Sequence, residues 1–237
     1  MKFVSVIPAR YAATRFPGKL MQMLGNKSII RHVYDNTVAA GLFDEVLVAT
    51  DSEIIFDEII QHGGKAVMSR KEHDSGSDRI AEAVAMLDAD VVVNVQGDEP
   101  FISKEPLEKL VQLFDDPAVQ VASLMRKISE QEAQNPHNVK VVTDKNNNAL
   151  YFSRSVIPHR RDAGVAANYF LHVGVYAYRK EMLLLFTTWP HSALEETEKL
   201  EQLRFLENGV KIRMAETGYN NIAIDTPEDL ERAIAAL

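Results

Sequence analysis

Residues 4–21 read VSVIPARYAATRFPGKLM, and this stretch decides the fold. It begins as an apolar strand, passes through a loop of small residues and continues into a helix-like segment. The loop gathers cations in a chain whose net charge is −8, and these cations are Arg10, Arg15 and Lys19. Because backbone N–H groups and basic side chains together favour anions, the stretch predicts a cradle for phosphate groups.

The small residues of this loop allow close approach of a ligand. Ala9 and its neighbours keep bulky side chains away from the backbone N–H groups, while arginine pairs with phosphate oxygens in a bidentate manner. The loop has neither the P-loop pattern nor the glycine fingerprint of dinucleotide-binding proteins, which disfavours a nicotinamide dehydrogenase. A basic loop that only faces solvent remains the alternative at this point.

Strands and helices alternate over the first half of the chain. Apolar runs predict strands over residues 3–8, 45–50, 65–69 and 90–96, and helical spacing predicts helices over 28–43, 53–64 and 78–87. This alternation is typical of an α/β protein with a mostly parallel sheet covered by helices on both faces. Ligands bind at the carboxyl ends of such strands, where Arg10, Asp51 and Asp98 are expected to share one rim.

The pattern changes after about residue 120. Strands are predicted over residues 119–128, 139–144, 148–155 and 170–180, with a hairpin at 144–148, and a further strand over 211–217. One continuous helix is predicted over 194–209 and a final helix over 226–237. No linker divides the chain, so we expect a single domain, 1–237, with a β-rich extension at about 120–190.

The composition limits the classes of function. With 46% hydrophobic and 25% charged residues, the 237-residue chain is typical of a soluble globular protein. Its net charge of −8 argues against binding nucleic acid or a membrane surface. The absence of cysteine excludes disulfides and thiolate chemistry. No signal peptide or membrane-spanning run is visible, so we expect a cytoplasmic protein.

Two acidic residues follow apolar stretches and form a candidate metal site. Asp98 lies in VNVQGDEPFI directly after a predicted strand, and Asp225 lies in AIDTPEDL before the last helix. Mg²⁺ prefers one or two carboxylates together with phosphate and water. Taken singly, each aspartate could equally be a turn or helix-capping residue.

A third segment, HDSGSDR at residues 73–79, predicts a tight turn at a helix start. Ser75 and Gly76 are suited to an anion there, and Arg79 could contact a ligand or pair with a carboxylate.

The chain contains five segments in this order: IPARYAATRFPGK, NVQGDEP, LYFSR, LEQLR and DTPEDLE. Together they resemble the 3-deoxy-D-manno-octulosonate (Kdo) cytidylyltransferase family, the CMP-Kdo synthetases. The resemblance runs from residue 3 to about 232. The related enzymes for sialic acids have a different first loop, similar to IPARGGSK. The resemblance implies a Rossmann-like nucleotidyltransferase fold and transfer of CMP from CTP to Kdo, with release of pyrophosphate, for lipopolysaccharide biosynthesis.

The resemblance also implies roles for individual residues. The catalytic residues would be Lys19, Asp98 and Asp225, with Mg²⁺ held by Asp98 and Asp225. The nucleotide would be bound by Ala9, Arg10, Arg15, Lys19, Ser75, Gly76 and Arg79. The sugar acid would be bound by Gln96, Arg154, His172, Tyr176, Glu201 and Gln202. A homodimer built through the later β region is also implied.

Two alternatives stay open at this stage. The sequence departs from the family in PHRRDAG and YNNIAID, which leaves open a related sugar acid such as 8-amino-Kdo. A non-catalytic CTP-binding regulator on the same scaffold would bind CTP without releasing pyrophosphate.

Overall fold

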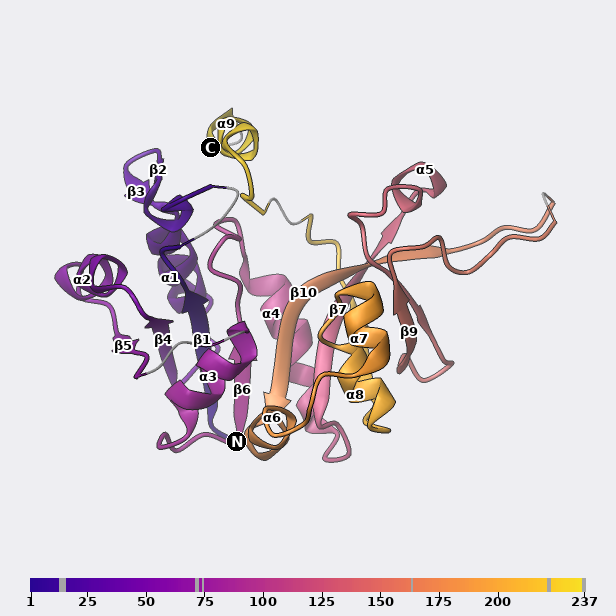
Figure 1. Cartoon of the computed structure of the whole chain (residues 1–237), viewed down its shortest axis with the longest axis horizontal. Coiled ribbons are helices and arrows are strands. Elements are labelled where there is room, and N and C mark those ends of the chain that lie inside the picture. Colours follow the sequence, from indigo (N-terminus) through magenta and orange to yellow (C-terminus); the bar gives the residue numbers. More distant parts are fainter. Residues whose placement is uncertain (13–15, 71–72, 74, 163, 221–222, 236–237) are drawn as a thin grey trace.

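The computed structural model describes residues 1–12, 16–70, 73, 75–162, 164–220 and 223–235. Among these residues the chain forms a twisted nine-stranded sheet with helices on both faces (Figure 1). The α/β fold predicted from the sequence is therefore confirmed. A separate two-stranded hairpin, which the sequence did not indicate, consists of β2 (Met23–Leu24) and β3 (Lys27–Ser28).

The first half of the sheet is parallel, as predicted. Its strands are β1 (Phe3–Ala9), β4 (Glu45–Thr50), β5 (Ala66–Met68) and β6 (Val91–Asn94). Strand β1 lies between β4 and β6 and is parallel to both, and β5 continues the sheet beyond β4. The carboxyl ends of these strands therefore meet at one edge, where an α/β protein binds its ligand.

The second half of the sheet is mixed. Its strands are β7 (Val121–Ile128), β8 (Lys140–Thr143), β9 (Ala149–Ser153), β10 (Tyr169–Arg179) and β11 (Ile212–Glu216). The long strand β10 joins the two halves, because it runs antiparallel to both β6 and β7. Strand β11 closes the edge in parallel with β7, and β8 and β9 extend beside β10.

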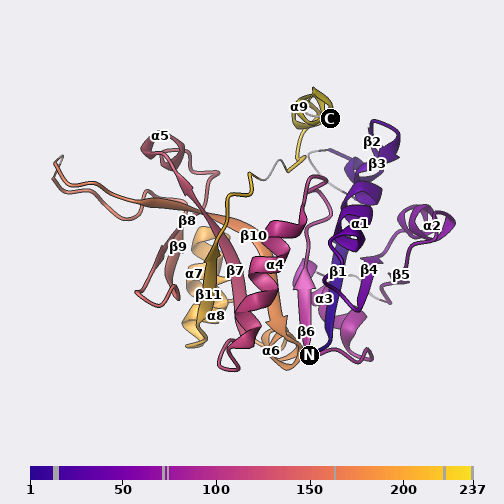
Figure 2. The ribbon, with the colours of Figure 1, turned by 180° about the vertical axis from the view of Figure 1, so that it is seen from behind.

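Two hydrophobic cores cover the two faces of the sheet. On β1, Ile7 packs into one core and Val4 and Val6 into the other, as expected from the alternation of side chains along a strand. The first face is covered by α1 (Ile29–Ala39), α2 (Glu53–Gln61), α4 (Lys104–Gln112) and α9 (Pro227–Ala235). The second is covered by α3 (Gly76–Val84), α6 (Lys180–Phe186) and α8 (Leu203–Glu207). Figure 2 looks onto the first face, with α4 in front of the sheet.

The single helix predicted over residues 194–209 is wrong. The structure has two helices instead, α7 (Ala193–Glu198) and α8, because Lys199 adopts a left-handed backbone conformation with φ of 53°. The N–H of Leu200 then donates to the carbonyl of Glu195 at 3.2 Å, a bond that closes a helix end. The break turns the chain so that Glu201 and Gln202 face the sheet rather than solvent.

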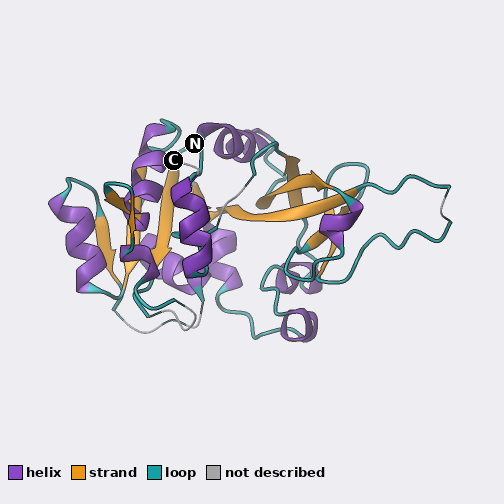
Figure 3. Cartoon of the chain, turned by 90° about the horizontal axis from the view of Figure 1, so that it is seen from above, coloured by secondary structure: helices purple, strands orange, loops and turns teal. Residues whose placement is uncertain are grey.

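The chain between β9 and β10 projects far from the sheet (Figures 1 and 3). Val165 in this segment is 60% exposed, and Leu150 on the adjoining strand β9 is 61% exposed. A short helix, α5 (Glu130–Ala133), lies beside the base of this projection. None of the helices in the described part of the chain is both long and apolar enough to span a membrane.

Candidate active site

Two glycines, one after β1 and one after β6, allow the chain to pack closely at the carboxyl edge of the sheet. Gly18, with φ of 65°, precedes a single 3₁₀ turn, η1 (Lys19–Met21), which sets Lys19 at the edge. Gly97 follows β6, and a Cβ atom there would lie 3.0 Å from the carbonyl oxygen of Pro8. Because this contact is tighter than a Cβ atom normally makes, glycine allows the loop after β6 to lie against the end of β1.

Lys19 bridges the two predicted metal ligands. Its ammonium nitrogen lies 2.6 Å from an oxygen of Asp98 and 2.9 Å from an oxygen of Asp225. Burial opposes the charged form of Lys19, but the two carboxylates outweigh it and raise the pKa of the lysine. The structure thus brings together residues that are 79 and 206 positions from Lys19 in the sequence.

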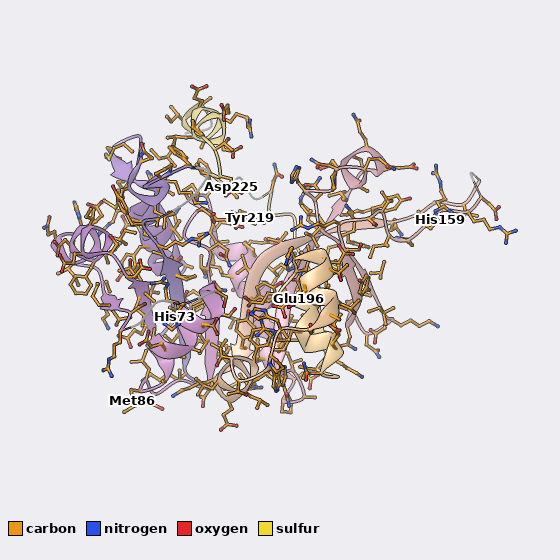
Figure 4. The ribbon with its side chains drawn as sticks, in the orientation of Figure 1. His73, Met86, His159, Glu196, Tyr219 and Asp225 are labelled. Carbon is orange, nitrogen blue, oxygen red and sulfur yellow. The ribbon has the colours of Figure 1, made fainter. Side chains whose placement is uncertain are left out.

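Asp225 reaches this position on a segment that crosses the molecule. The chain leaves β11, passes over the sheet and enters α9, and Figure 4 shows Tyr219 and Asp225 along this crossing. The N–H of Ile224 donates to the carbonyl of Asp98 at 3.0 Å. The hydroxyl of Tyr219 donates to Glu99, the residue after Asp98, at 3.4 Å. Asp98 and Asp225 are therefore held together through the backbone as well as through Lys19.

A cavity of about 410 Å³ opens beside this cluster. Nine of the predicted site residues line it, namely Ala9, Arg10, Lys19, Ser75, Gly76, Arg79, Gln96, Asp98 and Asp225. Ser75 is the N-cap of α3: its hydroxyl accepts from the N–H of Asp78 at 3.1 Å and donates to the Asp78 carboxylate. The start of α3 and the cations of the β1 loop therefore face one cavity that suits an anionic ligand.

Arg79 lies on the wall of this cavity, and its guanidinium is already engaged. It forms an ion pair of 2.6 Å with Asp51 after β4, and it donates to the hydroxyl of Ser69 after β5 at 3.0 Å. The side chain is only 5% exposed. Of the two roles left open by the sequence, pairing with a carboxylate is the one seen here, and it fixes α3 to two strand ends.

A second, smaller cavity of about 230 Å³ adjoins the first. Gly76 and Gln96 line both cavities, so the two spaces share a wall. The remaining lining includes Tyr176, Glu201 and Gln202, three of the residues predicted to bind the sugar. The amide of Gln96 donates to the carbonyl of Gly174 at 3.3 Å, at an irregularity of β10 that shifts its register before Tyr176.

Glu201 is the acidic group of the second cavity. Its carboxylate accepts a short hydrogen bond from the hydroxyl of Ser77. Burial raises the pKa of Glu201, although the bond to Ser77 and the charge of Arg204 act in the opposite direction. The cavity therefore offers a carboxylate, three amides and two phenols, which are groups that hydrogen-bond hydroxyls.

Three predicted site residues are not placed in either cavity. Arg154 donates to the backbone carbonyls of Glu198 at 2.8 Å and Lys199 at 3.5 Å, so it holds the turn after α7. His172 lies behind Tyr176, with ring centroids 5.3 Å apart, and burial lowers its pKa to about 3. Arg15 lies outside the described residues.

The structure adds residues that were not predicted. His73 lines the larger cavity and lies 2.6 Å from the carboxylate of Glu82 on α3 (Figure 4). Phe16 lines the same cavity, and Asn94 and Tyr178 line the smaller one. His73 stands within the HDSGSDR segment, which did carry a signal. Asn94 and Tyr178 look like ordinary strand residues, and only the pairing of strand β6 with strand β10 brings them to the site.

The acidic pair fits a divalent cation. A positive group, the ammonium of Lys19, already lies between Asp98 and Asp225, so the two carboxylates point at a common position. No group of three or more potential ligand side chains occurs among the described residues. Mg²⁺ tolerates this, because it commonly takes one or two carboxylates and completes its shell with phosphate and water.

Comparison with known proteins gives consistent matches. A model of the cytidylyltransferase family matches residues 4–212. A 3-deoxy-manno-octulosonate cytidylyltransferase of Flavobacterium johnsoniae is 58% identical, over 100% of this chain and 99% of its own length. The enzyme of the same name from Christiangramia forsetii is 51% identical, over 98% of this chain and 95% of its own length.

The solved structures agree with the sequence comparisons. A CMP:2-keto-3-deoxy-manno-octonic acid synthetase in complex with CTP superimposes with a TM-score of 0.96 at 43% identity, covering 100% of this chain and 98% of that one. A 4-diphosphocytidyl-2C-methyl-D-erythritol synthase of Anaerococcus prevotii gives a TM-score of 0.67 at 18% identity, covering 99% of this chain and 98% of that one. The second likeness concerns the fold alone.

Proposed function

Since the chain belongs to the 3-deoxy-manno-octulosonate cytidylyltransferase family, we propose that it transfers CMP from CTP to Kdo and releases pyrophosphate. CTP and Kdo are the two substrates in this proposal. The known structure in complex with CTP, which shares this fold over the whole chain, supports CTP as the nucleotide.

One observation in the structure carries the proposal: the two cavities share Gly76 and Gln96. The larger cavity has cations and a helix start, as a triphosphate requires. The smaller one has hydroxyl-binding groups, as a polyhydroxylated sugar requires. Because they adjoin, a sugar hydroxyl in the smaller cavity could reach the α-phosphorus of a nucleotide in the larger one.

The mechanism we propose depends on positioning and charge. The anomeric hydroxyl of Kdo attacks the α-phosphorus in line, the bond from the α-phosphorus to the bridging oxygen breaks, and pyrophosphate leaves. Arg10, Arg15 and Lys19 neutralise the triphosphate, and the backbone at Ala9, Ser75 and Gly76 approaches its oxygens. Asp98 and Asp225 would hold Mg²⁺, which supplies charge stabilisation and lowers the pKa of the attacking hydroxyl.

The sugar side of the site is assigned from the lining of the smaller cavity. Gln96, Tyr176, Glu201 and Gln202 line the smaller cavity and would bind hydroxyl groups directly. Arg154 and His172 are engaged with protein groups, so we propose that they shape the pocket: Arg154 through the turn after α7, and His172 through the ring of Tyr176.

We further propose that the enzyme acts as a homodimer in the cytoplasm and supplies lipopolysaccharide biosynthesis. The β-rich region exposes apolar side chains at Leu150 on β9 and at Val165 on the projection, and these would form the dimer contact. Sedimentation equilibrium should then give twice the chain mass of 26.6 kDa. A monomer at micromolar concentration would contradict this part of the proposal.

The decisive experiment measures pyrophosphate release from CTP and Mg²⁺ with Kdo, 8-amino-Kdo or N-acetylneuraminate. We expect release with Kdo. Faster release with the 8-amino sugar would keep the reaction and change the substrate. No release with any of the three, in a protein that still binds CTP, would contradict the transferase and favour a regulator.

A further inference from the structure

We propose that Lys19 acts as an exchangeable counter-ion: it occupies the acidic pair until nucleotide phosphates draw its ammonium away and so open the pair to a divalent cation. This inference rests on the proposed function and concerns the order in which the same site is filled. It makes nucleotide and cation binding mutually dependent.

The geometry sets the lysine ammonium and a divalent cation in competition for the same two carboxylates. The Lys19 ammonium lies 2.6 Å from Asp98 and 2.9 Å from Asp225, which is direct contact with both carboxylates. Mg²⁺ needs its oxygen ligands at about 2.0–2.1 Å, so it would compete for the same oxygen atoms. Two positive ions in one pair of carboxylates would also repel each other strongly.

Lys19 can move without disturbing the loop. Its backbone is held, because its N–H donates to the carbonyl of Phe16 at 3.1 Å and its carbonyl accepts from Gln22 at 3.0 Å. The side chain is a flexible four-carbon chain with a charged end. It lines the cavity that also contains Arg10 and the start of α3, so its ammonium can turn from the carboxylates towards phosphate oxygens.

The acidic pair without a nucleotide is a poor cation site for a second reason. The described residues supply two carboxylates there, with no third acidic or histidine side chain grouped with them. Phosphate oxygens would therefore provide missing ligands at the same moment as they attract Lys19. The added ligands and the removal of Lys19 both strengthen cation binding, so tight binding of the cation requires the nucleotide.

The test measures binding of Mn²⁺ alone to the full chain without nucleotide, by titration calorimetry and by the electron paramagnetic resonance signal of free Mn²⁺. We expect Lys19→Met and Lys19→Gln to bind Mn²⁺ at least about tenfold more tightly than the unaltered protein, which corresponds to about 1.4 kcal/mol. Lys19→Arg keeps the positive charge and should bind Mn²⁺ as weakly as the unaltered protein.

Two controls separate this effect from a general change in charge. Lys27→Met removes a cation that pairs with Asp35 on the surface, at 2.8 Å, and should change Mn²⁺ affinity by less than about twofold. Adding Asp98→Asn to Lys19→Met should abolish the gained affinity. Circular dichroism checks that each variant is folded. Lys19→Met and Lys19→Gln give two independent measurements of Mn²⁺ affinity without the lysine charge.

Unchanged or weaker Mn²⁺ binding in both neutral Lys19 variants would overturn the inference. Tightened binding that survives Asp98→Asn would also overturn it, because the ion would then bind elsewhere. Pyrophosphate release by the unaltered protein is measured in parallel. Release without tightened Mn²⁺ binding rejects only the exchange, whereas tightened Mn²⁺ binding without release rejects only the transferase.

Discussion

At the scale of single residues, the site contains partly buried charged side chains that are stabilised by ion pairs with side chains of opposite charge. Asp98 is the clearest case, since its side chain is 26% exposed and touches Lys19, which is 15% exposed. Replacing this carboxylate by a group of the same shape should leave the fold intact but remove the charge that the reaction needs.

Asp98→Asn should therefore abolish turnover and leave the fold intact. The amide keeps the size of the side chain but loses the charge that would hold a cation against the triphosphate. Charge stabilisation of several kcal/mol is expected from such a site, so kcat should fall on the order of a thousandfold. Pyrophosphate release measures the effect, and the thermal midpoint checks the fold. Wild-type rates in this variant would remove Asp98 from the proposed metal site.

His172 should make stability depend on acidity. Its ring lies between Phe152 and Tyr176, and burial lowers its pKa from 6.5 to about 3. Below pH 6.5 the imidazole binds a proton in the unfolded chain but stays neutral in the folded chain. The free energy of unfolding therefore falls as the pH falls. Between pH 7 and 5 the loss from this group is at most about 2 kcal/mol, because the unfolded chain gains its proton over only about 1.5 pH units of that range.

Urea unfolding of the unaltered protein and of His172→Gln at several pH values between 7 and 5 measures this difference. The glutamine variant should show a flatter dependence over this range. Parallel curves for the two proteins would show that the imidazole is not the group responsible.

At the scale of elements, the break between α7 and α8 shapes the smaller cavity. Glu195 on α7 and Arg204 on α8 form a two-pronged ion pair, with Nε and Nη2 of Arg204 at 2.7 and 2.5 Å from the carboxylate oxygens. Both side chains are less than a tenth exposed. The pair fixes the angle between the two helices and so the positions of Glu201 and Gln202 between them.

Arg204→Ala should lower the free energy of unfolding by about 3–5 kcal/mol, because it leaves the Glu195 carboxylate buried without this partner. The double variant Glu195→Leu with Arg204→Met removes both charges and should recover most of the loss. Denaturant unfolding measures both. A small effect of the single change, below about 1 kcal/mol, would show that solvent reaches the pair.

At the scale of the whole molecule, the segment from β11 to α9 joins the two halves of the sheet. β11 lies at one edge of the sheet beside β7, whereas Asp225 contacts Lys19, which follows β1, and Ile224 bonds to Asp98, which follows β6. Thr217 donates to Glu105 on α4 at 2.5 Å, and Tyr219 donates to Glu99. The position of Asp225 thus depends on contacts made along the entire crossing.

Tyr219→Phe should therefore weaken cation binding by the proposed site without unfolding the protein. The lost hydrogen bond is long, at 3.4 Å, so we expect it to contribute no more than an ordinary hydrogen bond, about 1 kcal/mol. The Mg²⁺ concentration for half-maximal pyrophosphate release should rise a few-fold, with kcat at saturating Mg²⁺ nearly unchanged. Tyr151→Phe, on β9, is the matched control. An equal response in both variants would contradict a positioning role for Tyr219.

The sequence by itself determined the parallel half of the sheet, because apolar runs of strand length and helices with one apolar face have few ways to pack. It also indicated Lys19, Asp98, Ser75 and Gly76, which directly follow or precede regular elements. Their place at the carboxyl edge follows from the direction of the strands.

Only the tertiary structure decided the contacts between distant segments. It places Lys19 between Asp98 and Asp225, pairs Arg79 with Asp51 and divides the predicted helix at Lys199. These outcomes depend on where the chain crosses itself and on one left-handed residue. The local periodicity of the sequence predicts neither the crossing of the chain nor the left-handed residue. Burial and charge pairing between remote side chains are properties of the packed molecule.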